Sequence, residues 1–382
     1  MQKAAIYPFD KDCICYIPLL SEKFSELRLV LPYGHAHIGK DISALDKREH
    51  VGLLLESNIN LVINEIDVLI IPRYADISRT NKKLYFTVVN AALKALQKGK
   101  NVLYGKVFNS DDELMLKQYS KLCKAEFVEY DGHKQELKLH TDQKKSVNPL
   151  MRTKQPEASV VFVGDLLDHG KSNSTEVAIQ LTYNMKQKGY KVITFIEPGL
   201  GQLLELQNIN DLIPYDTMNL GVNTIATISE KINKIDMDDK PDLIIIQLPG
   251  NMLPLNAERI IDGGVYAYMI SLSIKPDAFV CCTPFNINDN SYIEKLNEMI
   301  NLRFGYQMTC LHLSNIKITL ARTPEHIPYE KMYLPVKFVC ENLTNRPDGD
   351  IPLFCCLDPD AADDMCDFVK QHLTNYLSAT TI

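Results

Sequence analysis

The sequence predicts an α/β protein with two domains, each built on a parallel β-sheet. Three observations support this prediction: short apolar runs alternate with amphipathic stretches, the runs stop at turn-forming residues, and a polar segment interrupts the alternation after residue 130. Short apolar runs bounded by turns are typical of buried parallel strands. A chain of 382 residues is long enough for two such domains.

In the first part of the chain, three apolar runs end at proline-containing turns. They are Ala4–Tyr7, Leu27–Leu31 and Asp67–Ile71. Between residues 81 and 100 apolar residues recur at helical spacing, and Gly99 closes the segment as a helix C-cap would. Asn101–Tyr104 is the next predicted strand. Because strand, helix and strand in this order form a βαβ unit, we expect residues 1–130 to be a Rossmann-like domain.

The second part of the chain resumes the alternation after a polar, basic stretch. We interpret residues 131–157 as the connection and residues 158–382 as a second parallel-sheet domain. A long amphipathic stretch, Thr175–Lys188, predicts a helix after the first strand. The predicted strands are Val160–Val163, Lys191–Phe195, Leu243–Ile246, Ala278–Cys281 and Cys310–Leu313.

Composition excludes several functional classes. A formal net charge of −7 offers no basic surface for DNA or RNA, so nucleic acid is not an expected partner. No apolar run approaches the roughly 20 residues of a membrane helix, and the first residues lack a signal-peptide pattern. We therefore expect a soluble cytoplasmic protein that does not bind membranes; a homo-oligomer is left open.

The ten cysteines favour reduced, buried thiols over metal ligands. Their spacing contains no C-x-x-C pair of the kind that zinc and iron–sulfur sites use. One group, Cys355, Cys356 and Cys366 near Asp358 and Asp360, keeps the alternative of a functional cluster open.

The segment Gly164–Ser172 has the character of a phosphate-binding loop. It follows a predicted strand and precedes a predicted helix, and it contains two glycines, Lys171 and Ser172. Glycines let successive N–H groups turn toward one phosphate, the following helix offers its positive end, and the lysine adds a charge. A serine after the lysine can reach a magnesium ion. The second domain is therefore expected to resemble a P-loop NTPase.

Three features favour the alternative of a polar turn with a surface lysine. Five residues separate the two glycines, one more than in the usual P-loop, and two of them, Asp165 and Asp168, oppose a polyphosphate unless a metal intervenes. Asn173 with Glu176 also resembles a helix cap, which would start the helix late. The candidate ligand-binding residues are Gly164, Asp168, His169, Gly170, Lys171, Ser172, Asn173 and Gln247, and ATP or GTP with Mg²⁺ is the candidate ligand.

Gln247 ends the predicted strand that begins at Leu243. P-loop proteins place a metal-holding carboxylate at the end of such a strand. An amide carries no charge for magnesium and cannot act as a base, so we expect hydrolysis of a bound nucleotide to be slow or absent. A core strand with a turn explains the segment nearly as well.

In the first domain, polar residues follow the predicted strands. The loop Tyr33–Asp41 contains His35, His37 and Lys40, and we favour a loop that lines a cleft over a metal site. Arg73, after another strand, suits an anionic group, with a solvated turn arginine as the alternative.

The order of parts resembles the D-glutamate N-acyltransferase-like family, which joins a Rossmann-like half to a P-loop-like half. The resemblance lies in Ile66–Phe108, Gly164–Lys171, Pro241–Pro254 and Gly263–Pro284. That family also has five residues between the two glycines, but it has an acidic residue where this chain has Gln247. The resemblance implies acyl transfer as one candidate activity.

Over most of the chain the sequence is also similar to bacterial peptide maturation system proteins, which are encoded with ribosomally made natural-product peptides. The similarity lies in Ile6–Asp10, Gly39–Asp41, Val161–Gly164, Glu176–Val177 and Lys188–Val192. It implies that the protein modifies or handles a precursor peptide, with that peptide or a modifying enzyme as partner. Whether the chain is an enzyme stays open, and the alternative is a non-catalytic partner with a degenerate phosphate loop.

Overall fold

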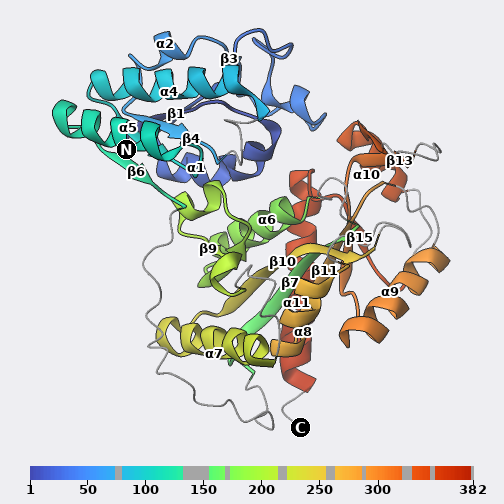
Figure 1. Ribbon diagram of the computed structural model, residues 1–382. Coiled ribbons are helices and arrows are strands. Elements are labelled where there is room, and N and C mark those ends of the chain that lie inside the picture. Colours follow the sequence, from blue (N-terminus) through green and yellow to red (C-terminus); the bar gives the residue numbers. More distant parts are fainter. Residues whose placement is uncertain are drawn as a thin grey trace. The chain divides into compact units, whose positions relative to one another are not determined.

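The computed structural model divides into two compact units (Figure 1). Unit 1 comprises Met1–Asp46, His50–Asp142 and Pro198–Glu205, and unit 2 comprises Lys47–Glu49, Gln143–Glu197 and Leu206–Ile382. The predicted connection, residues 131–157, lies almost wholly outside the described residues. The structure describes residues 1–73, 80–131, 155–167, 173–213, 222–254, 263–285, 290–320, 329–344 and 349–379.

Unit 1 contains a six-stranded parallel sheet in the order β3-β2-β1-β4-β5-β6. This is the strand order of Rossmann folds, so the predicted Rossmann-like architecture is confirmed. The strands are β1 (Lys3–Ile6), β2 (Glu26–Val30), β3 (Leu55–Glu56), β4 (Val68–Ile71), β5 (Asn101–Tyr104) and β6 (Phe127–Glu129).

Helix α4 (Lys82–Gln97) covers β4 and β5 and shows why the periodic segment folds as expected. Its apolar positions Val88, Ala92 and Leu96 are fully buried. The Asn81 side chain accepts a hydrogen bond from the Leu84 N–H, and Gly99 ends the helix with φ of +69°. Further helical segments of unit 1, where the structure describes it, are η1 (Lys11–Tyr16), α1 (Ile17–Lys23), η2 (Ile42–Leu45), α2 (Ile59–Val62), α5 (Ser110–Cys123) and η3 (Leu200–Leu204).

Unit 2 contains a seven-stranded parallel sheet in the order β15-β12-β11-β7-β10-β8-β9. The strands are β7 (Ser159–Leu167), β8 (Val192–Ile196), β9 (Gln207–Asn208), β10 (Leu243–Leu253), β11 (Ala278–Thr283), β12 (Cys310–Leu313) and β15 (Leu353–Phe354). A separate antiparallel hairpin joins β13 (Ile316–Leu320) to β14 (Tyr329–Tyr333). Two parallel sheets confirm the predicted α/β class.

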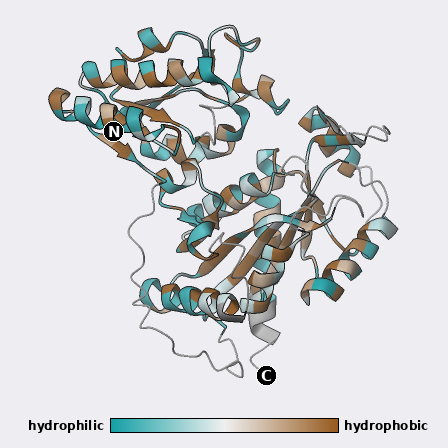
Figure 2. Cartoon of the chain, viewed as in Figure 1, coloured by the Kyte–Doolittle hydropathy of each residue, from teal (hydrophilic) through white to brown (hydrophobic). Residues whose placement is uncertain are grey.

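Helices cover both faces of the second sheet. Helices α6 (Ser174–Gln187) and α11 (Pro359–Ala379) contact each other on one face. On the other face α7 (Val222–Asp239), α8 (Val265–Ser273) and α9 (Asn290–Phe304) pack over a core that includes Phe162 and Phe279. Strands of both sheets are predominantly apolar, as buried parallel strands require (Figure 2). The remaining helical segments are η4 (Ile209–Asp211) and α10 (Val336–Thr344).

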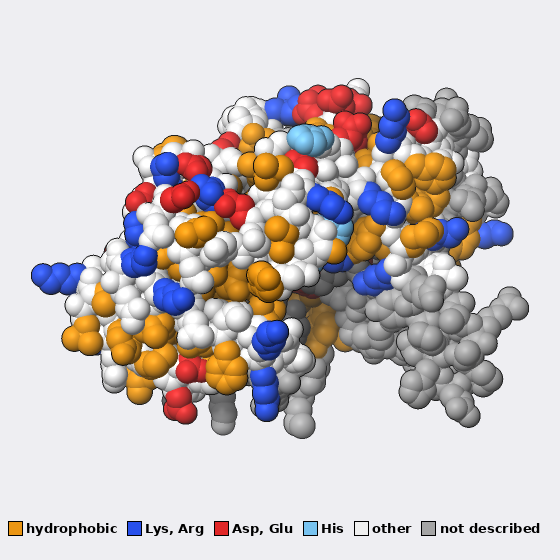
Figure 3. Space-filling view, turned by 90° about the horizontal axis from the view of Figure 1, so that it is seen from above, with side chains coloured by type: hydrophobic (Ala, Val, Ile, Leu, Met, Phe, Trp, Pro, Cys, Tyr) orange, Lys and Arg blue, Asp and Glu red, His pale blue; other side chains and the backbone are white. Residues whose placement is uncertain are grey.

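Charged side chains of both signs lie on the face drawn in Figure 3. Lysine and arginine side chains are interspersed there with acidic and apolar ones. Within the described part of the chain, no helix is both long and apolar enough to span a membrane.

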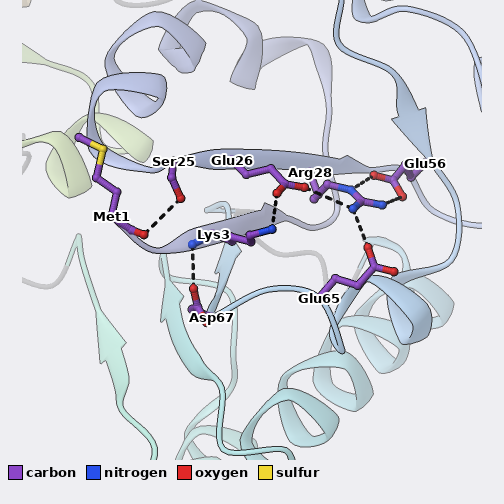
Figure 4. A network of polar contacts seen from close by, with 8 residues as sticks. All are labelled: Met1, Lys3, Ser25, Glu26, Arg28, Glu56, Glu65 and Asp67. Atoms are coloured by element: carbon purple, nitrogen blue, oxygen red, sulfur yellow. Dashed lines mark hydrogen bonds and ion pairs between the residues drawn. The ribbon is translucent and has the colours of Figure 1, made fainter.

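Arg28 on β2 forms ion pairs with glutamates from several elements of unit 1 (Figure 4). Its guanidinium contacts Glu56 through both Nε and Nη2, the latter at 2.7 Å, and Glu65 at 2.7 Å. Glu26 lies 3.4 Å from Arg28 Nη1 and 2.7 Å from Lys3 Nζ. One arginine therefore joins β2 to β3 and to the segment before β4.

We expect Arg28→Met to lower the free energy of unfolding by about 1 kcal/mol, because the glutamates lose their shared cation. Denaturant unfolding at low and high salt measures this, and the loss should shrink at high salt. Lys117→Ala, which removes an exposed i,i+4 pair with Glu113, is the matched control and should cost less than about 0.5 kcal/mol. Equal stability of Arg28→Met and wild type would show that the network contributes nothing.

Candidate functional site

The candidate site lies at the carboxyl end of β7, where the strand order changes direction. β10 and β8 lie on one side of β7, and β11 and β12 lie on the other. The helix after β7, α6, packs on one face, whereas α8 and α9, which follow β10 and β11, pack on the opposite face. Ligands of open α/β sheets bind at such a switch point. The topology of unit 2 therefore favours the turn that joins β7 to α6.

The central part of this turn lies outside the described residues. It contains Asp168, His169, Gly170, Lys171 and Ser172, so their predicted ligand contacts stay predictions. The described structure places the other predicted site residues, Gly164, Asn173 and Gln247.

Gly164 lies inside β7, opposite Cys281 of β11. A Cβ atom on Gly164 would lie 3.0 Å from Met252 Sδ, 3.2 Å from Leu248 Cδ1 and 3.3 Å from Phe279 Cε2. Close packing therefore accounts for the glycine. The strand also runs on to Leu167, beyond the predicted end at Val163, so the turn begins after Gly164. A ligand contact of Gly164 stays a prediction.

Asn173 connects the turn to α6 in the left-handed conformation, with φ of 67°. Its Nδ2 donates to Glu176 Oε2 at 3.2 Å, and its Oδ1 accepts from the Ser314 hydroxyl. The side chain thus binds two other side chains and does not cap a helix N–H. Helix α6 begins at Ser174, after the position at which the P-loop lysine usually opens the helix. The late start expected from Asn173 and Glu176 is confirmed.

A buried polar network fixes the first turn of α6. Ser174 Oγ donates to Asp165 Oδ2 at 2.6 Å, and Gln247 Nε2 donates to Ser174 Oγ at 3.1 Å and to Thr175 Oγ1 at 2.8 Å. The Glu197 N–H donates to Gln247 Oε1 at 3.0 Å. Gln247, which is 2% exposed, thus uses both ends of its amide inside the protein. Its described role is to join β10 and the end of β8 to α6.

Arg48 neutralises the acidic residue in the first turn of α6. Its Nη2 lies 2.8 Å from Glu176 Oε1, and the two side chains are only 11% and 7% exposed. The segment Lys47–Glu49 belongs to unit 2, where the Val336 N–H donates to the Lys47 carbonyl at 3.0 Å. Sequence reasoning missed Arg48, Ser174 and Thr175. A hydroxyl pair beside Asn173 was the available signal for the last two, whereas no local pattern pointed to Arg48.

The chemistry of this arrangement suits an anion better than a catalytic base. By helix geometry the N–H groups of Ser174 and Thr175 have no acceptor within α6, and they point toward the N-terminal end of that helix. Asp165 is engaged by Ser174, and Glu176 is paired with Arg48. A phosphate here would also meet the charge of Asp165, which favours a bridging metal ion.

Arg73 of unit 1 has an internal partner. Its Nη1 lies 3.2 Å from Asp131 Oδ2, and the Asp131 side chain is fully buried. Asp131 Oδ1 also accepts from the Lys106 N–H at 2.8 Å. Burial raises the pKa of Asp131, although Arg73 opposes that rise. Arg73, which was predicted to bind an anionic ligand, thus pairs with a buried carboxylate of its own unit. Tyr74, the next residue, lies outside the described residues.

The turn after β1 differs from that of dinucleotide-binding Rossmann domains. Such domains carry a G-x-G-x-x-G turn whose backbone approaches a pyrophosphate. Here Tyr7–Asp12 contains no glycine, and Asp10 caps η1 by accepting from the Asp12 N–H at 2.9 Å. The acidic cap leaves this turn unsuited to a phosphate.

The loop Tyr33–Asp41 of unit 1 presents Tyr33, His35 and Lys40 to solvent. The rings of His35 and His37 are 5.4 Å apart. Throughout the described ranges, no group of three or more His, Cys, Asp or Glu side chains is arranged to hold a metal ion.

Asp41 closes that loop through backbone hydrogen bonds. It accepts from the N–H groups of Ser43 at 2.9 Å, Val51 at 3.1 Å and Gly52 at 2.7 Å. Burial alone would raise the pKa of Asp41, but these hydrogen bonds outweigh it and lower the pKa to about 2.

The lowered pKa of Asp41 predicts how the stability of the fold changes in acid. The Asp41 carboxylate stabilises the folded state above its usual pKa of 3.8, and this stabilisation is lost as the pH falls toward 2. We expect Asp41→Asn to lower the free energy of unfolding by about 1 to 2 kcal/mol at pH 7. Denaturant titrations between pH 7 and pH 2 should show the difference narrowing below pH 4; a difference that is constant with pH would contradict this origin.

Gln247→Leu tests the buried network. We expect the free energy of unfolding to fall by about 2 to 3 kcal/mol, because Ser174, Thr175 and the Glu197 N–H lose a buried partner. Gln97→Leu, at an exposed position of α4, is the surface control and should change stability by less than about 0.5 kcal/mol. Equal unfolding curves for Gln247→Leu and wild type would mean that the network does not hold the helix start.

Comparison with known proteins supports the fold and does not identify an activity. No family model matches the chain, and no curated protein matches it. A putative oxidoreductase from Bacillus subtilis covers 49% of this chain and 52% of its own at 10% identity, but its TM-score of 0.25 carries no structural argument. A DUF1611 family protein from Anabaena variabilis aligns over 97% of this chain and 100% of its own, with 12% identity and a TM-score of 0.58. The chain therefore shares the two-sheet α/β fold of that protein over nearly its whole length.

Proposed function

We propose that unit 2 binds a nucleotide or another phosphorylated ligand at the turn between β7 and α6, and that the protein uses this site in handling or modifying a ribosomally made precursor peptide. Lys171 neutralises phosphate charge, and Ser172 assists a metal ion. We infer the peptide partner from the sequence similarity to peptide maturation system proteins. We infer the phosphorylated ligand from the residue types in the turn.

The observation that carries the proposal is the buried network of Asp165, Ser174 and Gln247 at the switch point. Buried polar groups cost free energy unless all are paired, and paired networks rigidify what they join. This network joins two neighbouring strands to the first turn of α6. It therefore fixes the start of α6, whose first N–H groups are the donors that we propose for the anion.

ATP or GTP with Mg²⁺ is the ligand that fits this proposal best. The acidic residues Asp165 and Asp168 beside the turn favour a phosphate that is accompanied by a divalent cation. Gln247 stands where P-loop enzymes use a carboxylate, and its amide is already engaged. Binding without rapid hydrolysis follows from that substitution.

Isothermal titration calorimetry with ATP and GTP, with and without Mg²⁺, tests the site. We expect binding by wild type and at least about tenfold weaker binding by Lys171→Ala, because one ammonium contact to phosphate is lost. Lys186→Ala removes an exposed lysine from the same helix and should bind as wild type does. No binding by wild type, or equal binding by Lys171→Ala, would contradict the proposal.

The engaged amide of Gln247 also favours a second candidate, a non-catalytic partner whose phosphate loop no longer works. In that case the chain should co-purify with the precursor peptide or its modifying enzyme, and Lys171→Ala should not change the yield. Nucleotide binding together with a Lys171-dependent yield would exclude this alternative.

A further inference from the structure

Helices α8 and α9 of unit 2 contact each other and share an exposed apolar surface. Both helices bury the side chains that face the core of the unit, among them Ile270 of α8 and Ile300 of α9. Their outer sides nevertheless carry large apolar or aromatic side chains that are 40% to 80% exposed. These residues, which we call the α8–α9 surface, are Val265, Tyr268, Leu272, Tyr292, Met299 and Leu302.

In α8 the exposed positions form one stripe along the helix. Val265, Tyr268 and Leu272 have the spacing i, i+3 and i+7, which places them on one side of the helix. The sequence of α8, VYAYMISLS, contains no charged residue. A surface helix usually carries charged residues on its outer side, whereas depletion of charge is typical of the centre of a protein–protein interface. Tyr268 also reaches α9, where its ring lies 6.3 Å from the ring of Phe304.

The exposed side chains of α9 continue this stripe. Met299 lies one helical turn before Leu302 and Arg303, so these three residues share one side of α9. That side is next to α8, because Arg303 donates a hydrogen bond to the carbonyl of Gly263, just before α8 begins. The exposed positions of the two helices therefore join into a single surface.

We propose that the α8–α9 surface is the interface through which two copies of this chain form a two-fold symmetric dimer. From their exposed fractions, its six side chains present on the order of 500 Å² to solvent, most of it apolar. A standard interface buries about 800 Å² on each partner, and somewhat more than half of that area is apolar. The surface therefore has the apolar area that one partner of a stable dimer contributes.

The charges beside this surface suit a second copy of the chain. Exposed residues of both signs flank the stripe on α9, namely Glu294, Lys295 and Glu298. In a two-fold interface the same patch meets itself, so a flank of mixed sign can place the lysine of one copy near a glutamate of the other. A helix that binds a membrane surface carries mainly lysine and arginine around its apolar side instead.

Analytical ultracentrifugation of the full chain over a range of concentrations tests the proposal. We expect a monomer–dimer equilibrium for wild type and at least about tenfold weaker dimerisation for Leu302→Glu, because two carboxylates, one from each copy, enter the interface. Leu302 is 80% exposed, so the folded monomer should tolerate the change, which circular dichroism checks. Leu122→Glu, at a position of α5 that is 79% exposed, is the matched control and should dimerise as wild type does.

Amide hydrogen exchange then locates the interface. At concentrations where wild type is dimeric, the amides of α8 should exchange more slowly than they do in Leu302→Glu. Lys171→Ala should dimerise as wild type does, so the dimer and the nucleotide site can fail independently of each other.

Several outcomes would overturn the dimer. One is a wild type that stays monomeric at about 100 μM, well above the micromolar Kd that weak interfaces of standard size reach. Another is a dimer that neither Leu302→Glu nor Tyr268→Glu weakens, or that Leu122→Glu weakens equally. Monomeric wild type that binds phosphatidylcholine vesicles or the precursor peptide, with binding lost in Leu302→Glu, would assign the surface to a different partner.

Discussion

The hydrogen bond between the Ser174 hydroxyl and the Asp165 carboxylate is the contact on which the candidate site depends. It joins the strand before the turn to the helix after it, across a segment that contains Lys171. Gln247 adds the neighbouring strand to the same contact. Since each group is buried, loss of one partner leaves the others with an unpaired polar atom, which is costly in a medium of low polarity. The two ends of the turn are therefore fixed, whatever the turn itself binds.

Charge is balanced around this contact by residues that are distant in sequence. Glu176, in the first turn of α6, has Arg48 at 2.8 Å, and Asn173 donates to the same carboxylate. A negative charge in this turn is favoured by the helix dipole but opposes an anionic ligand. Pairing with Arg48 reduces that opposition. The same balance appears in unit 1, where Arg73 meets the buried Asp131.

Periodic apolar segments predicted the fold well, because burial against neighbours follows local pattern. The runs at Ala4–Tyr7 and Asn101–Tyr104, the helix before Gly99 and the strand order of βαβ units all depend on such patterns. The site was harder to predict. The predicted phosphate loop begins at Gly164, but β7 continues to Leu167, and within that strand Asp165 accepts a hydrogen bond from the Ser174 hydroxyl. A long-range hydrogen bond of this kind leaves no trace in the local sequence.

Amide hydrogen exchange across the turn and the start of α6, with and without saturating Mg²⁺-nucleotide, tests the central claim most directly. We expect the N–H groups of Ser174 and Thr175 to exchange more slowly when nucleotide is present, because the phosphate becomes their acceptor. Unchanged exchange at both residues, with nucleotide shown to be bound elsewhere or not at all, would contradict the assignment of this turn as the ligand site.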